Sequence, residues 1–208
     1  MIKNIIFDFG DIFINLDKPA TVRELTNKFG AFEINAEMDT VNKEFEKGIL
    51  SSDQFINFYS KIFRKANKEE LINAWNAIIL DFPEYRLKFI EKLALERKYR
   101  LFLLSNTNDI HIRYVEMSML PQRYMRFKDC FEKFYLSHEI GLRKPNREVF
   151  QFVLDQNKLK AEQTLFVDDT LENTEAADKL GIKTWNLQVG KEDIIQLNER
   201  LKTTYTQA

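Results

Sequence analysis

The sequence predicts an α/β fold, with a Rossmann-like, doubly wound parallel sheet and an inserted all-helical unit. Short apolar runs at residues 5–7, 101–104 and 165–167 are separated by helical patterns, as is typical of parallel strands buried on both faces. Residues 17–82 differ, because they contain several helical patterns and no strand-like run. We therefore expect a helical insert to interrupt the sheet after its first strand.

Each apolar run ends abruptly at a polar residue. The first run is followed by Asp8, the second by Ser105 and the third by Asp168. A fourth strand is expected at residues 183–187, after Gly181, which ends the preceding helix. Ligands of open α/β sheets bind at the carboxyl ends of the strands, so these polar residues are the candidate site.

Helices are expected wherever apolar residues recur at helical spacing. In the core this spacing predicts helices at residues 83–98, 145–156 and 171–180. In the insert two apolar stripes stand out, Phe55, Phe58, Tyr59, Ile62 and Phe63, and then Leu71, Trp75, Ile78 and Ile79. Ser51 is expected to cap the first of these helices. Residues 1–16 and 83–208 are thus expected to form the core, and residues 17–82 a small lid.

Composition excludes some classes of partner. The net charge of -1 provides no general attraction for nucleic acid or an anionic membrane. The N-terminal apolar run is too short for a signal peptide, and no stretch approaches the about 20 apolar residues of a membrane span. Cys130 is a single cysteine, so no intramolecular disulfide forms. We expect a cytoplasmic protein, monomeric or weakly dimeric.

The carboxylates at the strand ends need a compensating positive charge. Asp8 and the pair Asp168 and Asp169 would repel one another at one edge of the sheet. A hard cation with oxygen ligands, such as Mg²⁺, solves this problem, and a strongly raised pKa of one carboxylate is the alternative solution. A bound Mg²⁺ also favours a phosphate ligand, because the ion shares its coordination between carboxylates and phosphoryl oxygens.

Other candidate phosphate-binding groups lie near the same edge. Pro145 is expected in the first turn of the following helix, which leaves Lys144 at the mouth of that helix. There the lysine can act as a point charge for Asp8 and for a phosphoryl oxygen together. Ser105 and Asn106 can donate hydrogen bonds to another phosphoryl oxygen.

Four segments, in this order, resemble the motifs of the haloacid dehalogenase superfamily, subfamily IA: FDFGD (7–11), LLSNTN (103–108), RKPN (143–146) and VDDTLEN (167–173). The insert after the first motif resembles the C1-type helical cap of that superfamily. The resemblance covers essentially the whole chain and implies a Mg²⁺-dependent phosphatase acting on a small phosphorylated metabolite.

The resemblance implies a role for each matching residue. Asp8 would attack phosphorus and form an aspartyl-phosphate. Ser105, with Asn106, would bind the transferring phosphoryl group, and Lys144 would hold Asp8 and that group together.

The resemblance also implies a metal site. Its ligands would be Asp8, the backbone carbonyl of Gly10 and Asp169, with Asp168 as a second or water-mediated carboxylate. Asn173 would support this acidic loop from the helix that follows.

Gly10 departs from the usual pattern. Phosphatases of this superfamily typically carry an aspartate two residues after the nucleophile, which protonates the leaving group and then activates water. Loss of such an acid/base group costs about 10²- to 10⁴-fold in rate. Asp11 is adjacent, but neighbouring residues of an extended chain point to opposite sides. The Asp-x-Gly pattern, followed by Asp17, resembles a branch near glucose-1-phosphate phosphatase-like proteins, which share this glycine and retain phosphatase activity.

Several functions compete for this site. Hydrolysis of a small phosphate monoester, such as a sugar phosphate, is the leading hypothesis. A haloacid dehalogenase needs no metal, so the Asp168 and Asp169 pair argues against it, and a phosphomutase needs the acid/base group that Gly10 replaces. A phosphate-ligand binding or regulatory protein, in which Gly10 marks lost turnover, is the alternative from a different class.

Overall fold

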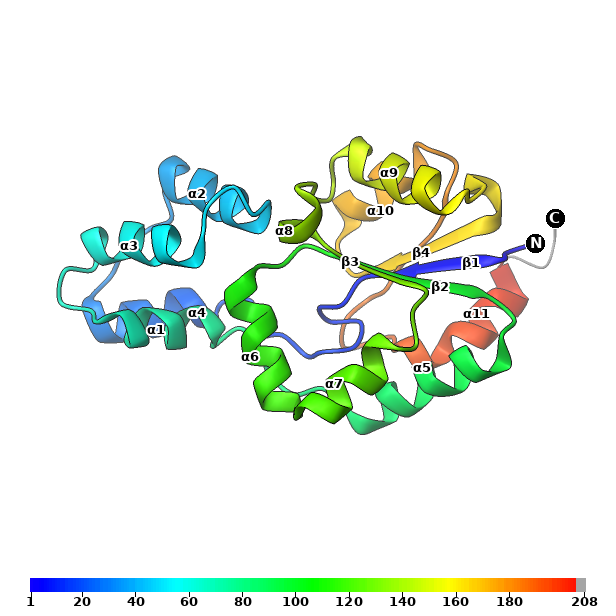
Figure 1. Ribbon diagram of the computed structural model, residues 1–208, viewed down its shortest axis with the longest axis horizontal. Coiled ribbons are helices and arrows are strands. Elements are labelled where there is room, and N and C mark those ends of the chain that lie inside the picture. Colours follow the sequence, from blue (N-terminus) through cyan, green and yellow to red (C-terminus); the bar gives the residue numbers. More distant parts are fainter. Residues whose placement is uncertain (205–208) are drawn as a thin grey trace.

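The computed structural model describes residues 1–204, which form a five-stranded parallel sheet with helices on both faces (Figure 1). The strand order is β3-β2-β1-β4-β5. The strands are β1 (Asn4–Phe7), β2 (Arg100–Ser105), β3 (Lys133–Leu136), β4 (Thr164–Asp168) and β5 (Lys183–Asn186). The predicted doubly wound sheet is confirmed.

The central strand β1 has apolar side chains that serve both faces of the sheet. Ile6 pairs in register with Phe102 of β2 and with Phe166 of β4, and all three are fully buried in one cluster. Ile5 and Phe7 point to the opposite face and belong to a second, larger cluster. This alternation explains why β1 is apolar at every position.

The two faces are covered by different helices (Figure 1). Buried residues of α5 (Glu84–Glu96), α6 (Asp109–Met119), α7 (Pro121–Lys128) and α11 (Leu197–Thr204) belong to the larger cluster. Buried residues of α9 (Arg147–Asn157) and α10 (Leu171–Asp178) belong to the other. The short helices are α8 (Ser137–Ile140), η1 (Ala161–Gln163) and η2 (Ile194–Gln196).

One core helix begins later than expected. The prediction placed Pro145 in the first turn of α9, but this helix begins at Arg147, after Asn146. The main-chain N–H and C=O of Lys144 are both bonded to the Asn106 side chain, and this pairing holds the segment outside the helix.

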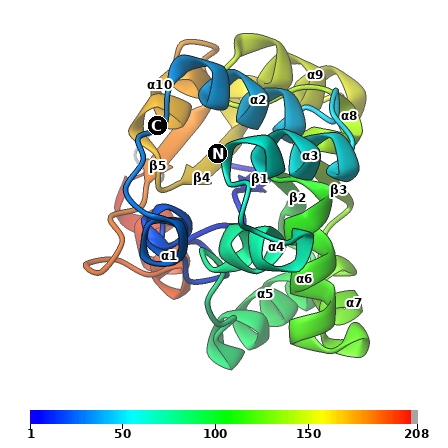
Figure 2. The same ribbon diagram turned by 90° about the vertical axis from the view of Figure 1, so that its left-hand side faces the viewer.

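The insert has four helices, α1 (Ala20–Phe29), α2 (Ala36–Glu46), α3 (Ser52–Ile62) and α4 (Lys68–Asn76), which lie beyond the carboxyl ends of the strands (Figures 1 and 2). They have a hydrophobic cluster of their own, in which Phe45 and Phe55 stack at 4.1 Å between ring centroids. Ser51 caps α3, as expected, because its hydroxyl accepts a hydrogen bond from Gln54 N and Gln54 Oε1 accepts one from Ser51 N.

The two linkers of the insert run side by side. Ile79 was expected to continue α4, but it forms an antiparallel bridge with Leu16 instead. Further main-chain bonds join Asn15 N to Asp81 O at 2.9 Å and Asp17 N to Ile78 O at 2.8 Å.

Within the described residues, no helix combines the length and the apolar stretch that crossing a membrane requires.

Candidate active site

Three adjacent strands end at the edge of the sheet that faces the insert (Figure 1), and each carries a polar residue at that end. Asp8 directly follows β1, Ser105 ends β2 and Asp168 ends β4. Because β1 lies between β2 and β4, Asp8 lies between the other two strand ends. The structure thus brings together the polar residues that follow the apolar runs in the sequence.

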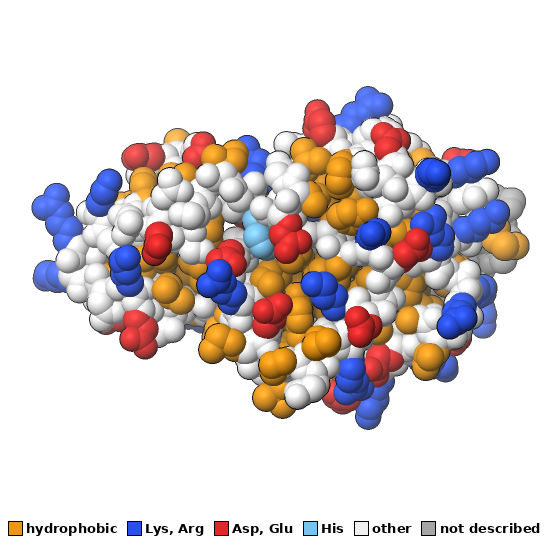
Figure 3. All heavy atoms as spheres, in the orientation of Figure 1, with side chains coloured by type: hydrophobic (Ala, Val, Ile, Leu, Met, Phe, Trp, Pro, Cys, Tyr) orange, Lys and Arg blue, Asp and Glu red, His pale blue; other side chains and the backbone are white. Residues whose placement is uncertain are grey.

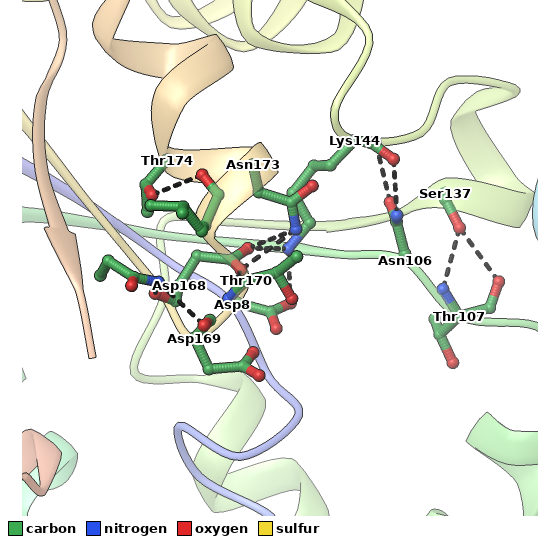
Figure 4. Close-up of polar contacts among 12 residues, drawn as sticks. Asp8, Asn106, Thr107, Ser137, Lys144, Asp168, Asp169, Thr170, Asn173 and Thr174 are labelled. Atoms are coloured by element: carbon green, nitrogen blue, oxygen red, sulfur yellow. Dashed lines mark hydrogen bonds and ion pairs between the residues drawn. The ribbon is translucent and has the colours of Figure 1, made fainter. Parts of the chain in front are cut away.

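A buried lysine links two of the carboxylates (Figure 4). Lys144 has only 1% of its side chain exposed, and its ammonium donates to Asp8 Oδ1 and to Asp168 Oδ2, each at 2.6 Å. A charged group can be buried in this way only when partners of opposite charge surround it. Lys144 therefore neutralises the acidic edge at one end.

Asn106 holds the backbone of Lys144 in place. Its amide nitrogen donates to Lys144 O, and its side-chain oxygen accepts from Lys144 N, both at 2.8 Å. The Asn106 amide nitrogen has a second N–H beyond the one donated to Lys144 O, and Asn106 lines the pocket that contains Asp8, so its hydrogen bond to a phosphoryl oxygen stays a prediction. Ser105 is buried and lines the same pocket as Asp8 and Lys144.

Burial is the largest single influence on the pKa of both Asp8 and Lys144. Desolvation raises the pKa of Asp8 to about 7, against the opposing effect of the Lys144 ammonium, and the neighbouring Asp168 and Asp169 add to the rise. Desolvation alone would lower the pKa of Lys144, but Asp168 and Asp8 outweigh it, so that the pKa of the lysine is raised. Lys144 thus stays charged at neutral pH.

Asp168 is held by the loop and helix that follow it. Its Oδ1 accepts from Thr170 N at 2.8 Å, and the Asn173 amide donates to both of its carboxylate oxygens at 3.1 Å (Figure 4). Together with the Lys144 contact, these bonds fix the orientation of the carboxylate. Asn173 thus supports the acidic loop, as the sequence suggested.

Asp169 has a different partner, which the sequence did not indicate. Lys18, in the linker before α1, places its ammonium 2.5 Å from Asp169 Oδ2 and 3.1 Å from Asp11 Oδ2. Burial by itself lowers the pKa of Lys18, but these two carboxylates outweigh it and raise the pKa. No local motif marks Lys18, because only the folded chain brings it to Asp169, 151 residues away.

The segment after Gly10 does not supply a second carboxylate in the pocket. Asp11 has left-handed backbone (φ 55°), and its Oδ1 accepts from Leu16 N at 3.0 Å. Leu16 in turn fills the space beside Gly10, where an added Cβ would lie 2.7 Å from Leu16 Cδ1. Asp11 therefore anchors the linker and Lys18, and does not line the pocket around Asp8.

The donor set suits a hard cation. Asp8, Asp168 and Asp169 each offer a carboxylate oxygen, and these oxygens lie within 4.8 Å of one another. Carboxylate oxygens are the ligands that Mg²⁺ binds in proteins. Since all three donors are oxygens, the chemistry of the cluster fits Mg²⁺ better than a softer metal.

A pocket of about 630 Å³ opens over these residues. Its floor includes Asp8, Ser105 and Lys144 from the core, and its opposite wall includes Lys43 and Glu46 from α2. The sequence did not mark these two insert residues, because a charged residue on an amphipathic helix is ordinarily a solvated one. The core also reaches the insert directly, since Arg143 Nε donates to Glu46 Oε2 at 2.9 Å.

Comparisons with known proteins agree with this geometry. A family model described as haloacid dehalogenase-like hydrolase matches residues 5–187. The D-ribitol-5-phosphate phosphatase of Bacteroides thetaiotaomicron is 30% identical over 196 residues, which make up 91% of this chain and 94% of that protein.

Solved structures show the same fold. A haloacid dehalogenase family enzyme of Bacteroides thetaiotaomicron, in complex with magnesium and inorganic phosphate, is 32% identical with a TM-score of 0.80, covering 92% of this chain and 97% of its own. A structure from Porphyromonas gingivalis, described as a predicted hydrolase of the same type, is 28% identical with a TM-score of 0.80 and covers 98% of both chains.

Proposed function

Because the chain belongs to the haloacid dehalogenase-like hydrolase family, we propose that it is a Mg²⁺-dependent phosphatase of small phosphate monoesters, with Asp8 as the nucleophile. The observation that carries this proposal is the buried Lys144 ammonium, which contacts both Asp8 and Asp168 at 2.6 Å. This arrangement keeps a carboxylate positioned at a strand end beside a charge that can also bind a phosphoryl oxygen.

Each residue of the floor has a proposed task. Asp8 attacks phosphorus through the oxygen that Lys144 leaves free; the bond from phosphorus to the ester oxygen of the substrate breaks, and the alcohol leaves with a proton from water. A water molecule then hydrolyses the aspartyl-phosphate, which releases inorganic phosphate and restores Asp8. The Ser105 hydroxyl donates to the transferring phosphoryl group, and Lys144 holds that group and Asp8 together. Asn106 acts through Lys144, whose backbone it binds.

Asp8, Asp169 and the carbonyl of Gly10 would hold Mg²⁺. We assign Asp168 a water-mediated contact, because both of its oxygens already accept hydrogen bonds. When bound, Mg²⁺ supplies positive charge that neutralises the carboxylates and polarises a phosphoryl oxygen. Asn173 keeps Asp168 oriented in either case.

The pocket favours a small polar substrate. Charged side chains of Lys18, Lys43, Glu46 and Arg143 line it above Asp8, and such groups bind hydroxyls and anions better than an apolar chain. The similar protein from Bacteroides thetaiotaomicron is named for a pentitol phosphate. Sugar phosphates and sugar-alcohol phosphates are therefore the proposed substrate class.

We assign residues 17–82 to a cap over residues 1–16 and 83–208, with substrate bound between them. Lys43 and Glu46 of α2 line the same pocket as Asp8, which supports this division. A cap excludes water and large substrates from the chemistry.

A catalytically weakened, phosphate-binding or regulatory protein is the second candidate. It is favoured by Gly10, since Leu16 fills the space beside that glycine and Asp11 does not line the pocket. In that case the site binds a phosphorylated ligand and releases little phosphate.

Phosphate release from a panel of pentose, pentitol and hexose phosphates, with Mg²⁺ and with EDTA, separates the two candidates. The phosphatase predicts turnover that needs Mg²⁺ and disappears in Asp8→Asn. Thermal stabilisation by a panel member without phosphate release above the Asp8→Asn level supports the second candidate. Turnover that persists in EDTA removes the metal from the mechanism.

The expected partners are small molecules. On the face shown in Figure 3, acidic and basic side chains are interspersed, and no single-sign patch for nucleic acid stands out there. We propose a cytoplasmic enzyme, monomeric or weakly dimeric, because its substrates are metabolites and its single cysteine needs no oxidising compartment.

A further inference from the structure

Lys18 connects the linker of the insert to the acidic edge of the sheet. Its ammonium contacts two carboxylates from different parts of the chain, Asp169 Oδ2 at 2.5 Å and Asp11 Oδ2 at 3.1 Å. Both carboxylates are nearly buried, with 8% of each side chain exposed, whereas 54% of the Lys18 side chain is exposed. Lys18 is therefore the exposed member of this cluster, and its side chain has several rotatable bonds.

The contact with Asp169 conflicts with a metal ion at the same carboxylate. Asp169 offers one of three oxygens that lie within 4.8 Å of one another. A divalent cation on that carboxylate and an ammonium within hydrogen-bonding distance of it repel each other strongly at such short range. One carboxylate can contact an ammonium and a metal ion together, as proposed for Asp8 with Lys144, but the repulsion makes Mg²⁺ binding at Asp169 less favourable while the Lys18 ammonium stays there.

Asp11 provides an alternative partner for the displaced ammonium. It belongs to the segment that follows Gly10 and is fixed by its hydrogen bond from Leu16 N at 3.0 Å. Lys18 also lines the pocket that contains Asp8 and Lys144. An ammonium that leaves Asp169 but stays near Asp11 remains at the wall of this pocket, where it faces the substrate.

We propose that Lys18 is a positioning residue that competes with Mg²⁺ for Asp169 and thereby lowers the affinity of the site for the metal. The inference rests on the proposed function, because it requires that Asp169 binds Mg²⁺. The competitor of Mg²⁺ is thus a residue of the protein itself, Lys18, in the linker that precedes α1. Leu16, two residues before Lys18, forms a β-bridge with Ile79 in the second linker of the insert. A move of the Lys18 ammonium from Asp169 to Asp11 therefore connects Mg²⁺ binding to the two linkers that join the insert to the core.

Calorimetric titration of Mg²⁺ into the full chain tests this proposal without measuring activity. Lys18→Met removes the competing ammonium, so Mg²⁺ is expected to bind about five-fold more tightly than to the wild type, as is reasonable for loss of a half-exposed ion pair. Lys18→Arg keeps the charge and the donors, and is expected to bind Mg²⁺ within about two-fold of the wild type.

Lys43→Met is the matched control for charge alone. Lys43 lines the same pocket, but its ammonium pairs with Asp39 at 2.5 Å. Among the described residues, it forms no ion pair with Asp8, Asp168 or Asp169. It is expected to change the Mg²⁺ affinity less than two-fold. Equal tightening in Lys43→Met and Lys18→Met would mean a general charge effect and would overturn the proposal.

Thermal unfolding in EDTA and then in Mg²⁺ provides a second measurement that is sensitive to folding. The rise in Tm on adding Mg²⁺ is expected to be larger for Lys18→Met than for the wild type, because ligand stabilisation grows with affinity. Lys18→Gln replaces the methionine variant if that variant does not fold.

Unchanged or weaker Mg²⁺ binding by the neutral Lys18 variants overturns the competition while leaving the proposed function in place. Absence of Mg²⁺ binding to the wild type instead overturns the proposed metal site, and the competition with it.

Discussion

Arg143 Nε donates a hydrogen bond to Glu46 Oε2 at 2.9 Å, which joins the segment beside Lys144 to the last turn of α2 in the insert. Both side chains are mostly shielded from solvent, with 20% and 28% exposed. Gly48, just after α2, also lies against the core, since an added Cβ there would meet His138 O. The insert thus contacts the core at the rim of the pocket.

Loss of this ion pair is expected to weaken substrate binding more than it slows turnover. Glu46→Gln removes an interaction of about 1 kcal/mol, so KM for the preferred sugar phosphate should rise about five-fold while kcat changes less than two-fold. Steady-state kinetics on the best substrate of the panel measures both constants. Glu37→Gln, at an exposed carboxylate of the same helix, is the control. A fall in kcat at constant KM would contradict this role for the ion pair.

Asp8 is expected to reduce the stability of the metal-free protein at high pH. Its pKa is raised from 3.8 to about 7, so between these values the folded state keeps a proton that the unfolded state has released. Stability therefore falls as the pH rises through this window, by an amount on the order of 4 kcal/mol. In EDTA, Asp8→Asn should be more stable than the wild type by about 2–4 kcal/mol at pH 8, with little difference at pH 4.

Urea unfolding at the two pH values measures this difference. Glu33→Gln, at an exposed carboxylate in the insert, controls for the loss of a charge and should show no such pH dependence. An Asp8→Asn protein less stable than the wild type at pH 8 would show that the Lys144 contact outweighs burial.

Gly10 is expected to accept an aspartate only when Leu16 is also changed. Gly10→Asp alone places its Cβ 2.7 Å from Leu16 Cδ1, so we expect a loss of about 1–2 kcal/mol in stability. The Gly10→Asp/Leu16→Ala double variant makes room for the carboxylate and should raise kcat about ten-fold if proton transfer limits turnover. Leu16→Ala is the control, and a double variant no faster than this control would show that proton transfer is not limiting.

His111 is expected to make the protein sensitive to acid. Burial lowers its pKa to about 4, against a hydrogen bond with Trp75 O that opposes the shift. As the pH falls from 6.5 toward 4, His111 binds a proton in the unfolded state but stays neutral in the folded state. Stability therefore falls by about 3 kcal/mol over this window and is fully present above it.

Comparison in an Asp8→Asn background isolates this effect, because Asp8 has the opposite pH dependence. In that background, His111→Gln should flatten the fall in the free energy of unfolding between pH 6.5 and 4.5. His111 stacks on Trp75 at 5.3 Å between ring centroids, so the variant is also expected to be less stable at pH 7. If the free energy of unfolding falls just as steeply between pH 6.5 and 4.5 in this variant, groups other than His111 cause the acid sensitivity.

The sequence predicts those parts of the fold and site that depend on local patterns. Four strands and the core helices α5, α9 and α10 follow from apolar runs and spacing, whereas α6, α7 and α11 were not predicted. Asp8, Ser105 and Asp168 follow from the ends of the apolar runs. Strand β3 was missed, although Phe134, Tyr135 and Leu136 form a short apolar run; it is an edge strand in which only Leu136 is buried.

Contacts between distant segments could not be predicted in the same way. Lys18 reaches Asp169 across 151 residues, and Glu46 meets Arg143 across 97 residues. Neither pair lies within one strand or helix, so no periodicity relates its members. The contact of Asn106 with the Lys144 backbone was missed for the same reason, since the two residues lie 38 positions apart.

The central position of β1 has a consequence for biosynthesis. Residues 4–7 leave the ribosome well before their partners in β2 and β4, which begin only at Arg100 and Thr164. All four helices of the insert are synthesised before β1 has a neighbouring strand. Pairing across such long separations is slow compared with local helix formation. Asp8 is thus translated 136 residues before Lys144, and Asp168 follows later still.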